Sequence, residues 1–206
     1  MGSYIHFIRH GITEGNRKKW YYGAADLHLS KEGIEEIEQL NKQNIYPDAD
    51  DADCYTTPLI RAKETFDLIY GNHLYKILPG FQEMRYGDFE MKSREDLADD
   101  PAYQEWMADA TRTTRPPGGE SVVEFRARVR EQYEELVGMH RLKDLSVRHN
   151  KKDAVSIVVC HGGVIGSIMM DVFPGSRKNF WRWIPKPGRG YTLRMEKGKV
   201  LDHGEI

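Results

Sequence analysis

Cysteine is scarce in this sequence, long apolar runs are missing, and neither sign of charge dominates. The two cysteines among the 206 residues, Cys54 and Cys160, lack C-x-x-C spacing and lie in or beside expected buried strands, so we expect reduced core thiols. The longest apolar runs are about one strand long, too short to cross a membrane, and no secretory signal is evident. The formal net charge of −2 does not favour nucleic acid or an anionic membrane as a partner. We therefore expect a globular protein of the cytoplasm.

Apolar runs with the length of strands alternate with segments of helical period. Strands are expected at 4–8, 53–57, 74–78 and 154–160, followed by a hairpin over 191–202 that turns at Gly198. Helices are expected from Ser30 to about Lys42, from Pro58 to Gly71, from the capping box at 121–124 onward, and from 162 to about Val172. This alternation favours an α/β fold with a mostly parallel central sheet.

One polar, proline-containing segment, at about 85–120, interrupts the alternation. It ends in R-P-P-G-G-E-S and has room for short helices near 94–107. Long irregular segments within compact domains are usually functional or disordered. We expect a single domain over residues 1–206, in which this segment forms an insertion, or lid, over the edge of the sheet.

Reactive polar side chains follow four of the expected strands. The first strand ends in Arg9 and His10, and the second leads into a helix whose first turn contains Arg61. The third leads to Glu83, and the last is followed by His161. Because ligands of open α/β sheets bind beyond the carboxyl ends of the strands, we expect these five side chains to meet at one edge.

Two arginines, two histidines and a carboxylic acid form a set that suits phosphoryl transfer. Two guanidiniums match the oxygens of a phosphate, and one imidazole could attack phosphorus. The second imidazole could stabilise the charge that develops on the equatorial oxygens. The acid could protonate the departing alkoxide and then accept a proton from water. Arginine and histidine supply the positive charge in this scheme, so it requires neither a metal nor a cofactor.

Six short motifs follow one another over roughly residues 4 to 170. They are R-H-G at 9–11 with Asn16 after it, YYGAADLHLSKEG at 21–33, TTPLIRAKETF at 56–66, EMRYGDFE at 83–90, PGGES at 117–121 and VVCHGGVI at 158–165. R-H-G alone would be a weak signal, but six ordered motifs are a strong one. Together they resemble the signature of the histidine phosphatase superfamily, also called the phosphoglycerate mutase-like family.

The resemblance implies a fold, an activity and a role for each matching residue. It implies a three-layer α/β/α sandwich and a phosphomonoester hydrolase that acts through a phosphohistidine on His10. Arg9, Arg61 and His161 would form the phosphate pocket, and Glu83 would be the proton donor. The residues that we expect to contact phosphate or substrate are Asn16, Thr13, Gly23, Tyr86, Gly162 and Arg112.

Departures from the family pattern leave the choice of activity open. Ile12, Gly15 and Met91 stand where relatives often have other residues, so the rim of the pocket and the substrate are in doubt. Hydrolysis is the favoured interpretation, and a cofactor-dependent phosphoglycerate mutase is the main alternative. A regulatory phosphate-binding protein is disfavoured, because it would have little reason to retain the acid. A zinc site on the two histidines is also disfavoured, because no third ligand occurs at a recognisable spacing.

Aromatic and basic residues near the expected site suggest what the substrate carries. We expect an aromatic mouth around the pocket, built from Trp20, Tyr21, Tyr22, Tyr103 and Trp106. Such a mouth would suit a small phosphorylated metabolite such as α-ribazole phosphate. Arg112 and Arg115 would attract a second anionic group, and F-W-R-W-I-P at 180–185 is expected to pack near the final hairpin or to form a self-association surface. Monomer and homodimer both remain open.

Overall fold

A six-stranded sheet runs through the centre of the molecule, with strand order β4-β3-β6-β1-β7-β8. The computed structural model describes residues 2–176 and 179–206. The six strands are β1 (Ser3–Arg9), β3 (Asp53–Thr56), β4 (Lys76–Ile77), β6 (Ala154–Cys160), β7 (Gly190–Glu196) and β8 (Lys199–Glu205). The first four in sheet order are parallel, whereas β7 and β8 are antiparallel to their neighbours. The expectation of a mostly parallel sheet is confirmed.

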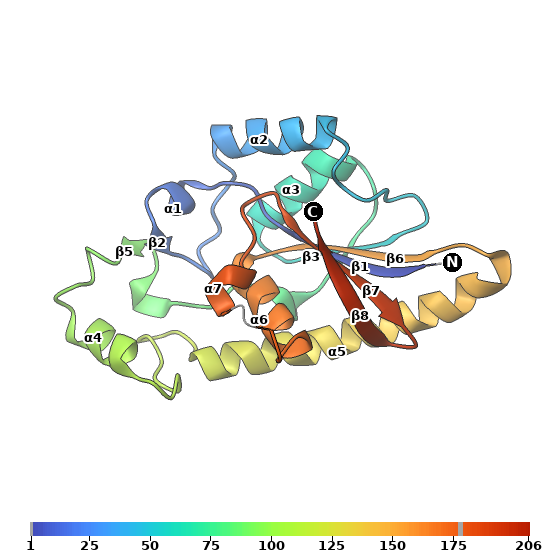
Figure 1. The fold of residues 1–206 in the computed structure, drawn as a ribbon. Helices are drawn as coiled ribbons and strands as arrows, with labels where there is room; N and C mark the ends of the chain where they lie inside the picture. The colour runs from blue at the N-terminus through green and yellow to red at the C-terminus, as the bar shows by residue number, and fades with distance from the viewer. Residues whose placement is uncertain (1, 177–178) are drawn as a thin grey trace.

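Helices cover both faces of this sheet (Figure 1). The helices are α1 (Glu14–Arg17), α2 (Lys31–Lys42), α3 (Ile60–Tyr70), α4 (Pro101–Ala108), α5 (Val122–Val147), α6 (Gly162–Val172) and α7 (Phe180–Trp183), and the 3-10 turns are η1 (Pro79–Phe81), η2 (Gly87–Phe89) and η3 (Arg148–Asn150). Apolar side chains of α2 and α3 pack on one face of the sheet, and those of α5 and α6 pack on the other. The result is the three-layer α/β/α sandwich implied by the family resemblance.

Strand β6 shows why the two faces are both apolar. Ile157 and Val159 belong to the core beneath α2 and α3, whereas Val158 and Cys160 belong to the core beneath α5 and α6. Successive side chains of a strand point to opposite faces, so a strand covered on both sides must be continuously apolar. Cys54 and Cys160 are both buried and neither forms a disulfide, as expected.

Local sequence signals set most helix boundaries. The hydroxyl of Ser30 accepts a hydrogen bond from the backbone N–H of Gly33 at the start of α2, and Ser121 with Glu124 forms the expected capping box of α5. Gly71 follows α3 with a φ of 62°, a left-handed conformation that favours glycine at this position. Helix α3 itself begins at Ile60, two residues later than we expected from Pro58.

Two expected elements differ from those in the structure. The strand expected at 74–78 is reduced to the two residues of β4, since only Tyr55 and Thr56 of β3 offer it partners. The helix expected near 94–107 is α4, which begins at 101 because the Asp100 carboxylate caps it and Pro101 occupies its first turn. Residues 94–99 form a series of turns instead.

The segment at 85–120 lies beyond the ends of β1 and β6, where α4 and β5 are seen in Figure 1. Strand β5 (Lys92–Ser93) pairs with β2 (Trp20–Tyr21), which follows α1. A small core of Phe89, Leu97 and Tyr103 holds the segment together. No helix in residues 2–176 or 179–206 has both the length and the apolar character needed to cross a membrane.

Candidate active site

The register of two neighbouring strands brings the two histidines together. Arg9 at the end of β1 lies directly beside Cys160 at the end of β6, so His10 and His161 leave the sheet at the same level. The backbone N–H of His10 donates to the Cys160 carbonyl at 3.0 Å, and the two imidazole rings lie 5.2 Å apart between centroids. Parallel pairing thus joins residues that are 151 positions apart in the chain.

The geometry around His10 sets its tautomer and its charge. Its Nδ1 lies 2.7 Å from the carbonyl oxygen of Gly11, and because a carbonyl only accepts, Nδ1 carries the proton and Nε2 holds a free lone pair. Burial lowers the pKa of His10 well below its usual range, and the positive charges of Arg61 and Arg9 lower it further. At neutral pH this side chain is therefore a neutral imidazole with an unprotonated Nε2.

Two buried guanidiniums lie beside this imidazole. Arg61 is fully buried, and its two terminal nitrogens donate to the carbonyls of Gly23 and Ala25 at 2.9 Å. Arg9 donates to the carbonyl of Pro185 at 2.8 Å. Burial lowers the pKa of both arginines, although the negative charge of Glu83 acts in the opposite direction.

Within the described residues, the charges of these two arginines have no carboxylate partner. The Nε atoms of Arg9 and Arg61 are buried without a hydrogen-bond partner, and no ion pair within residues 2–176 and 179–206 engages either side chain. A buried charge without a counterion costs free energy unless a ligand compensates for it. Paired guanidiniums are well suited to a phosphate, which can accept several charge-assisted hydrogen bonds.

Glu83 reaches the site from the loop that follows η1 and is held by backbone groups. One carboxylate oxygen accepts from the backbone N–H of Gly163 at 2.9 Å, and the other accepts from the N–H of Met84 at 3.0 Å. Gly163 lies in the first turn of α6, where helix N–H groups are unpaired. A Cβ at this position would lie 2.4 Å from Oε1 of Glu83, so the close approach depends on glycine.

His161 is the second imidazole of the site and is fully buried. Its Nε2 lies 2.9 Å from the hydroxyl of Thr57, while its Nδ1 is buried without a partner among the described residues. Burial lowers the pKa of His161 well below its usual range, and the charge of Arg61 contributes in the same direction. If the Thr57 hydroxyl donates to Nε2, Nδ1 carries the proton and can donate to an anion.

A cavity of about 750 Å³ opens from this cluster. The residues expected from the sequence that line it are Arg9, His10, Asn16, Arg61, Glu83, Tyr86, Gly162 and Arg112. Asn16 uses its amide oxygen to accept from the backbone of Thr13, which leaves its amide N–H groups available. The volume is much larger than one phosphate requires, so the cavity can also accept the group that carries the phosphate.

Two expected contact residues lie behind the wall of the cavity. Thr13 is fully buried, caps α1 and donates its hydroxyl hydrogen bond to Tyr22 at 2.8 Å. The carbonyl of Gly23 accepts from Arg61, and a Cβ on Gly23 would lie 1.6 Å from the carbonyl oxygen of Met84. Both residues therefore support the site from behind and do not line the cavity. The sequence does not show this, because it does not record which way their backbone segments face.

The expected aromatic mouth is present, but one of its five predicted residues lies elsewhere. Trp20, Tyr21, Tyr22 and Trp106 line the cavity as expected, but Tyr103 does not. The Tyr103 ring is buried against Phe89, and its hydroxyl lies 2.8 Å from that of Tyr21. Tyr103 lies on the inner side of α4, whereas Trp106 on the same helix reaches the cavity.

Other lining residues were missed from the sequence. Arg94, Arg126 and Trp181 all line the cavity, and Trp181 is 76% exposed. Trp183 packs against Tyr191 and His203 of the final hairpin, which confirms the expected packing for one of the two tryptophans. No local pattern distinguishes these residues from ordinary surface side chains.

Arg115 does not take part in the cavity. Its guanidinium pairs with the Glu124 carboxylate, with Nε donating to Oε2 at 2.8 Å. The expected role in attracting a second anion is therefore wrong for Arg115. Glu124 is held for this pairing by the capping box at the start of α5, which only the folded helix creates.

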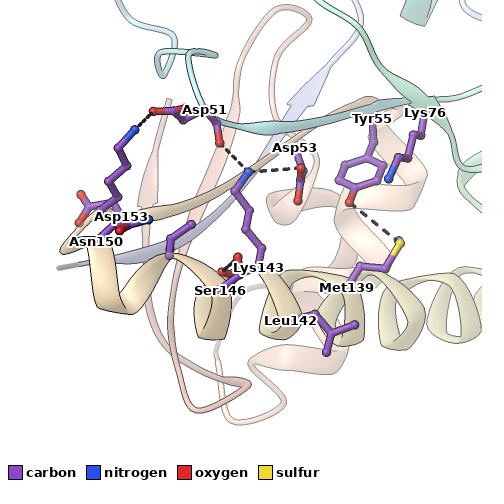
Figure 2. Close-up of a pocket in the computed structure, with 12 residues that line it drawn as sticks. Asp51, Asp53, Tyr55, Lys76, Met139, Leu142, Lys143, Ser146, Asn150 and Asp153 are labelled. Carbon is purple, nitrogen blue, oxygen red and sulfur yellow. Dashed lines mark hydrogen bonds and ion pairs between the residues drawn. The ribbon is translucent and has the colours of Figure 1, made fainter.

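A second depression lies at the opposite end of the sheet, between the start of β3 and the last turns of α5 (Figure 2). Its charged side chains neutralise each other. Lys143 is 3.2 Å from the Asp53 carboxylate and donates to the carbonyl of Asp51, while Lys152 is 2.6 Å from the Asp51 carboxylate. In contrast to Arg9 and Arg61, these cations already have partners, so the cavity at His10 is the better candidate for an active site.

The fold and this cluster are those of an enzyme that acts on phosphomonoesters, and comparison with known proteins agrees. The chain belongs to the histidine phosphatase superfamily (branch 1), whose family model matches residues 5–201. The expected family, fold class and enzyme type are thereby confirmed.

Two curated relatives carry different activities. The chain is 27% identical over 203 residues to the adenosylcobalamin/α-ribazole phosphatase of Salmonella typhimurium, covering 95% of this chain and 94% of the relative. It is 29% identical over 174 residues to the 2,3-bisphosphoglycerate-dependent phosphoglycerate mutase of Bradyrhizobium diazoefficiens, covering 79% and 77%. Among solved structures, the α-ribazole phosphatase of Shigella flexneri superposes with a TM-score of 0.74 at 24% identity, covering 96% of this chain and 93% of that one.

Proposed function

We propose that this protein hydrolyses phosphomonoesters of small metabolites through a phosphohistidine on His10. The observation that carries the proposal is the pair of buried guanidiniums, which have no counterion among the described residues and lie beside a neutral imidazole whose Nε2 is free. Arg9 and Arg61 would bind the phosphoryl oxygens. His161 lies beside His10, with 5.2 Å between the ring centroids, but does not line the cavity, and its expected role in the phosphate pocket stays a prediction. The amide of Asn16 and the backbone of Gly162 line the same cavity and would complete the binding site.

The proposed reaction has two steps. Nε2 of His10 attacks phosphorus, the bond from phosphorus to the ester oxygen breaks, and Glu83 gives its proton to the departing alkoxide. Water then attacks the phosphohistidine while the Glu83 carboxylate takes its proton, and the P–N bond breaks. The products are an alcohol and inorganic phosphate, and both side chains return to their initial state. Side-chain cations supply the charge stabilisation, so the scheme contains no metal ion.

Hydrolysis is favoured over the mutase reaction by the coverage of the relatives. The phosphatase relative aligns over nearly the whole chain, whereas the mutase relative aligns over about four fifths of it. We expect the protein to release inorganic phosphate from 4-nitrophenyl phosphate and from small phosphorylated metabolites, in the presence of EDTA. With 3-phosphoglycerate and its 2,3-bisphosphate, isomerisation should be slower than phosphate release. Much faster isomerisation would establish the mutase instead.

Exchanging Glu83 for glutamine is expected to separate alkyl from aryl substrates. Because glutamine cannot donate the proton that an alkoxide needs, kcat/KM for an alkyl phosphate should fall by about 10² to 10³-fold. A 4-nitrophenolate leaving group needs little protonation, so kcat/KM for 4-nitrophenyl phosphate should fall by less than about tenfold. Steady-state kinetics on both substrates provides the measurement.

A matched control for this experiment is Glu105→Gln on the exposed surface of α4, which should retain both activities. The choice of kcat/KM is important, because this ratio reports phosphoryl transfer to His10 and not the later hydrolysis step. Equal losses on the two substrates would show that Glu83 is not the acid.

A further inference from the structure

We propose that the distal half of the cavity is an anion subsite, formed by Arg112, Arg126 and Arg94, that selects phosphomonoesters with a second anionic group. The inference rests on the proposed function, because it places the ester phosphate at His10. It goes further in naming what the rest of the substrate carries.

The charges that line the cavity are strongly unbalanced. Five arginines and one carboxylate, that of Glu83, are found among the described residues that line it, although the whole chain has a net charge of −2. Arg9 and Arg61 match the charge of one phosphate dianion. The other three arginines lie outside that pocket, and clustered charge of one sign in a concave site concentrates ligands of the opposite sign.

Arg126 and Glu83 are held by opposite ends of α6. Arg126 is in the first turns of α5 and pairs with Asp171 near the end of α6, whereas Gly163 at the start of α6 binds Glu83. Eight residues of helix separate Gly163 from Asp171, which corresponds to roughly 12 Å at about 1.5 Å per residue. Arg126 and Glu83 thus contact opposite ends of α6.

The ion pair at Asp171 does not neutralise this region. Its carboxylate binds both Arg126 and Arg130, with the second contact at 2.9 Å, so two positive charges share one negative charge. In addition, Nε of Arg126 is buried without a hydrogen-bond partner among the described residues. One positive charge thus remains in excess at the distal end of the cavity.

Arg112 is held toward the same region by a strained and well-organised loop. The carboxylate of Asp109 accepts backbone hydrogen bonds from Thr111, Thr113 and Thr114, which winds the loop around it. Arg112 has a φ of 63°, a left-handed conformation that costs a non-glycine residue free energy. Its carbonyl accepts from the N–H of Val123, which fixes it over the first turn of α5 close to Arg126.

The side chain of Arg112 is not used for internal contacts. No hydrogen bond or ion pair within the described ranges engages its guanidinium or that of Arg94, and both residues are exposed. Arg115, three residues along the same loop, differs because its guanidinium pairs with Glu124. The loop thus directs one arginine into the cavity and neutralises the other.

The wall of the cavity also carries apolar side chains. Trp106, Phe125, Met170 and Trp181 line it, from four different helices. Aromatic and thioether side chains favour a planar or apolar group between the two anions. The expected substrate class is a phosphomonoester whose planar or apolar body ends in a carboxylate, sulfonate or second phosphate.

Binding of two non-hydrolysable phosphonates tests the subsite without turnover. The probes are (4′-carboxybiphenyl-4-yl)methylphosphonate and its carboxamide, which differ only in the distal charge. By isothermal titration calorimetry the carboxylate should bind about tenfold more tightly, the value expected for one partly exposed charge-assisted interaction. Equal affinities would overturn the subsite and leave the proposed function intact.

Variants then locate the effect. Arg112→Gln and Arg126→Gln should each reduce the affinity ratio by about threefold or more, and the double variant should bring it close to one. Arg115→Gln is the matched control, since it removes a neighbouring arginine that does not line the cavity, and it should retain the ratio. Thermal denaturation of each variant confirms that it is folded. An equal loss of the ratio in the control would show a general effect of surface charge and overturn the subsite.

Failure of the proposed function has a different signature. If the wild-type protein binds neither phosphonate and releases no phosphate from 4-nitrophenyl phosphate, the phosphate pocket itself is wrong, and the subsite falls with it.

Discussion

Replacing His10 with alanine is expected to lower kcat/KM for 4-nitrophenyl phosphate by at least about a thousandfold, because the variant has no group that can carry the phosphoryl group. His161 cannot substitute for it, since its Nε2 is engaged by Thr57. The rate of phosphate release measures the effect. In wild-type protein, rapid acid-free quenching with labelled substrate should also trap a phosphohistidine that the variant lacks.

The matched control for His10 is His73→Ala, at an exposed position outside the cavity, where the ring nitrogens contact the Tyr70 carbonyl and the Asp50 carboxylate. It should retain full activity. The thermal midpoint of the His10 variant should stay within several degrees of wild type, because the change removes one buried hydrogen bond, worth about 1 kcal/mol. Substantial turnover by a folded His10→Ala protein would contradict the assignment of the nucleophile.

The second large effect is a loss of stability in mild acid. Burial lowers the pKa of four histidines in the folded protein, His6, His10, His140 and His161, and that of His6 falls to about 4. Each is neutral when folded but is protonated in the unfolded chain below its ordinary pKa of about 6.5. Below pH 6.5 the unfolded state therefore binds more protons than the folded state. The stability that these histidines contribute is fully present above pH 6.5 and is lost as the pH falls toward the folded pKa.

From pH 7 to pH 5 the expected loss from His6 alone is roughly 2 kcal/mol at about 1.4 kcal/mol per pH unit, and His10, His140 and His161 add to it in the same direction. Asp96 and Asp109, whose pKa values hydrogen bonds hold below the usual range, lose their contribution only at lower pH. His28 has its pKa raised by Glu64 and acts in the opposite direction, but it is exposed and the effect is small.

Urea denaturation in phosphate-free buffers at pH 5, 6 and 7 gives the measurement. His6→Gln removes the imidazole that contacts Thr192 at 2.8 Å. The slope of the free energy of unfolding against pH should then fall by the equivalent of about one bound proton. The Tyr70 carbonyl and the Asp50 carboxylate raise the pKa of His73, which therefore acts in the opposite direction, so His73→Ala should not reduce the loss of stability in acid. A free energy of unfolding that is constant from pH 5 to 7 would show that these histidines are not held neutral by the fold.

Features that depend on neighbouring residues could be predicted from the sequence. Ser30 and Ser121 cap α2 and α5 because a cap is formed by residues three positions apart. The nearly continuous apolar run at 154–160 predicted β6, because a strand covered on both faces needs apolar side chains on both of them. His10 and His161 could be placed together because parallel strands end at a common edge, whatever the length of chain between them.

Features that depend on the direction of a side chain needed the tertiary structure. Tyr103 and Trp106 lie on one short helix, yet only Trp106 reaches the cavity, because the small core at Phe89 decides how α4 is turned. Arg112 and Arg115 lie in one loop, yet they face different partners, because Asp109 and the capped start of α5 shape that loop. Arg126 and Trp181 come from α5 and α7, which only the tertiary structure brings to the same cavity.

The sequence by itself therefore determined the α/β alternation with its mostly parallel sheet and the five polar side chains expected at one edge of that sheet. These follow from periodicity, from local caps and from the common edge of parallel strands, all of which a linear pattern can encode. Only the tertiary structure decided which residues form the wall of the cavity and its distal arginines. The orientation of α4, α7 and the 109–114 loop results from contacts between segments distant in sequence, and no local pattern records those contacts.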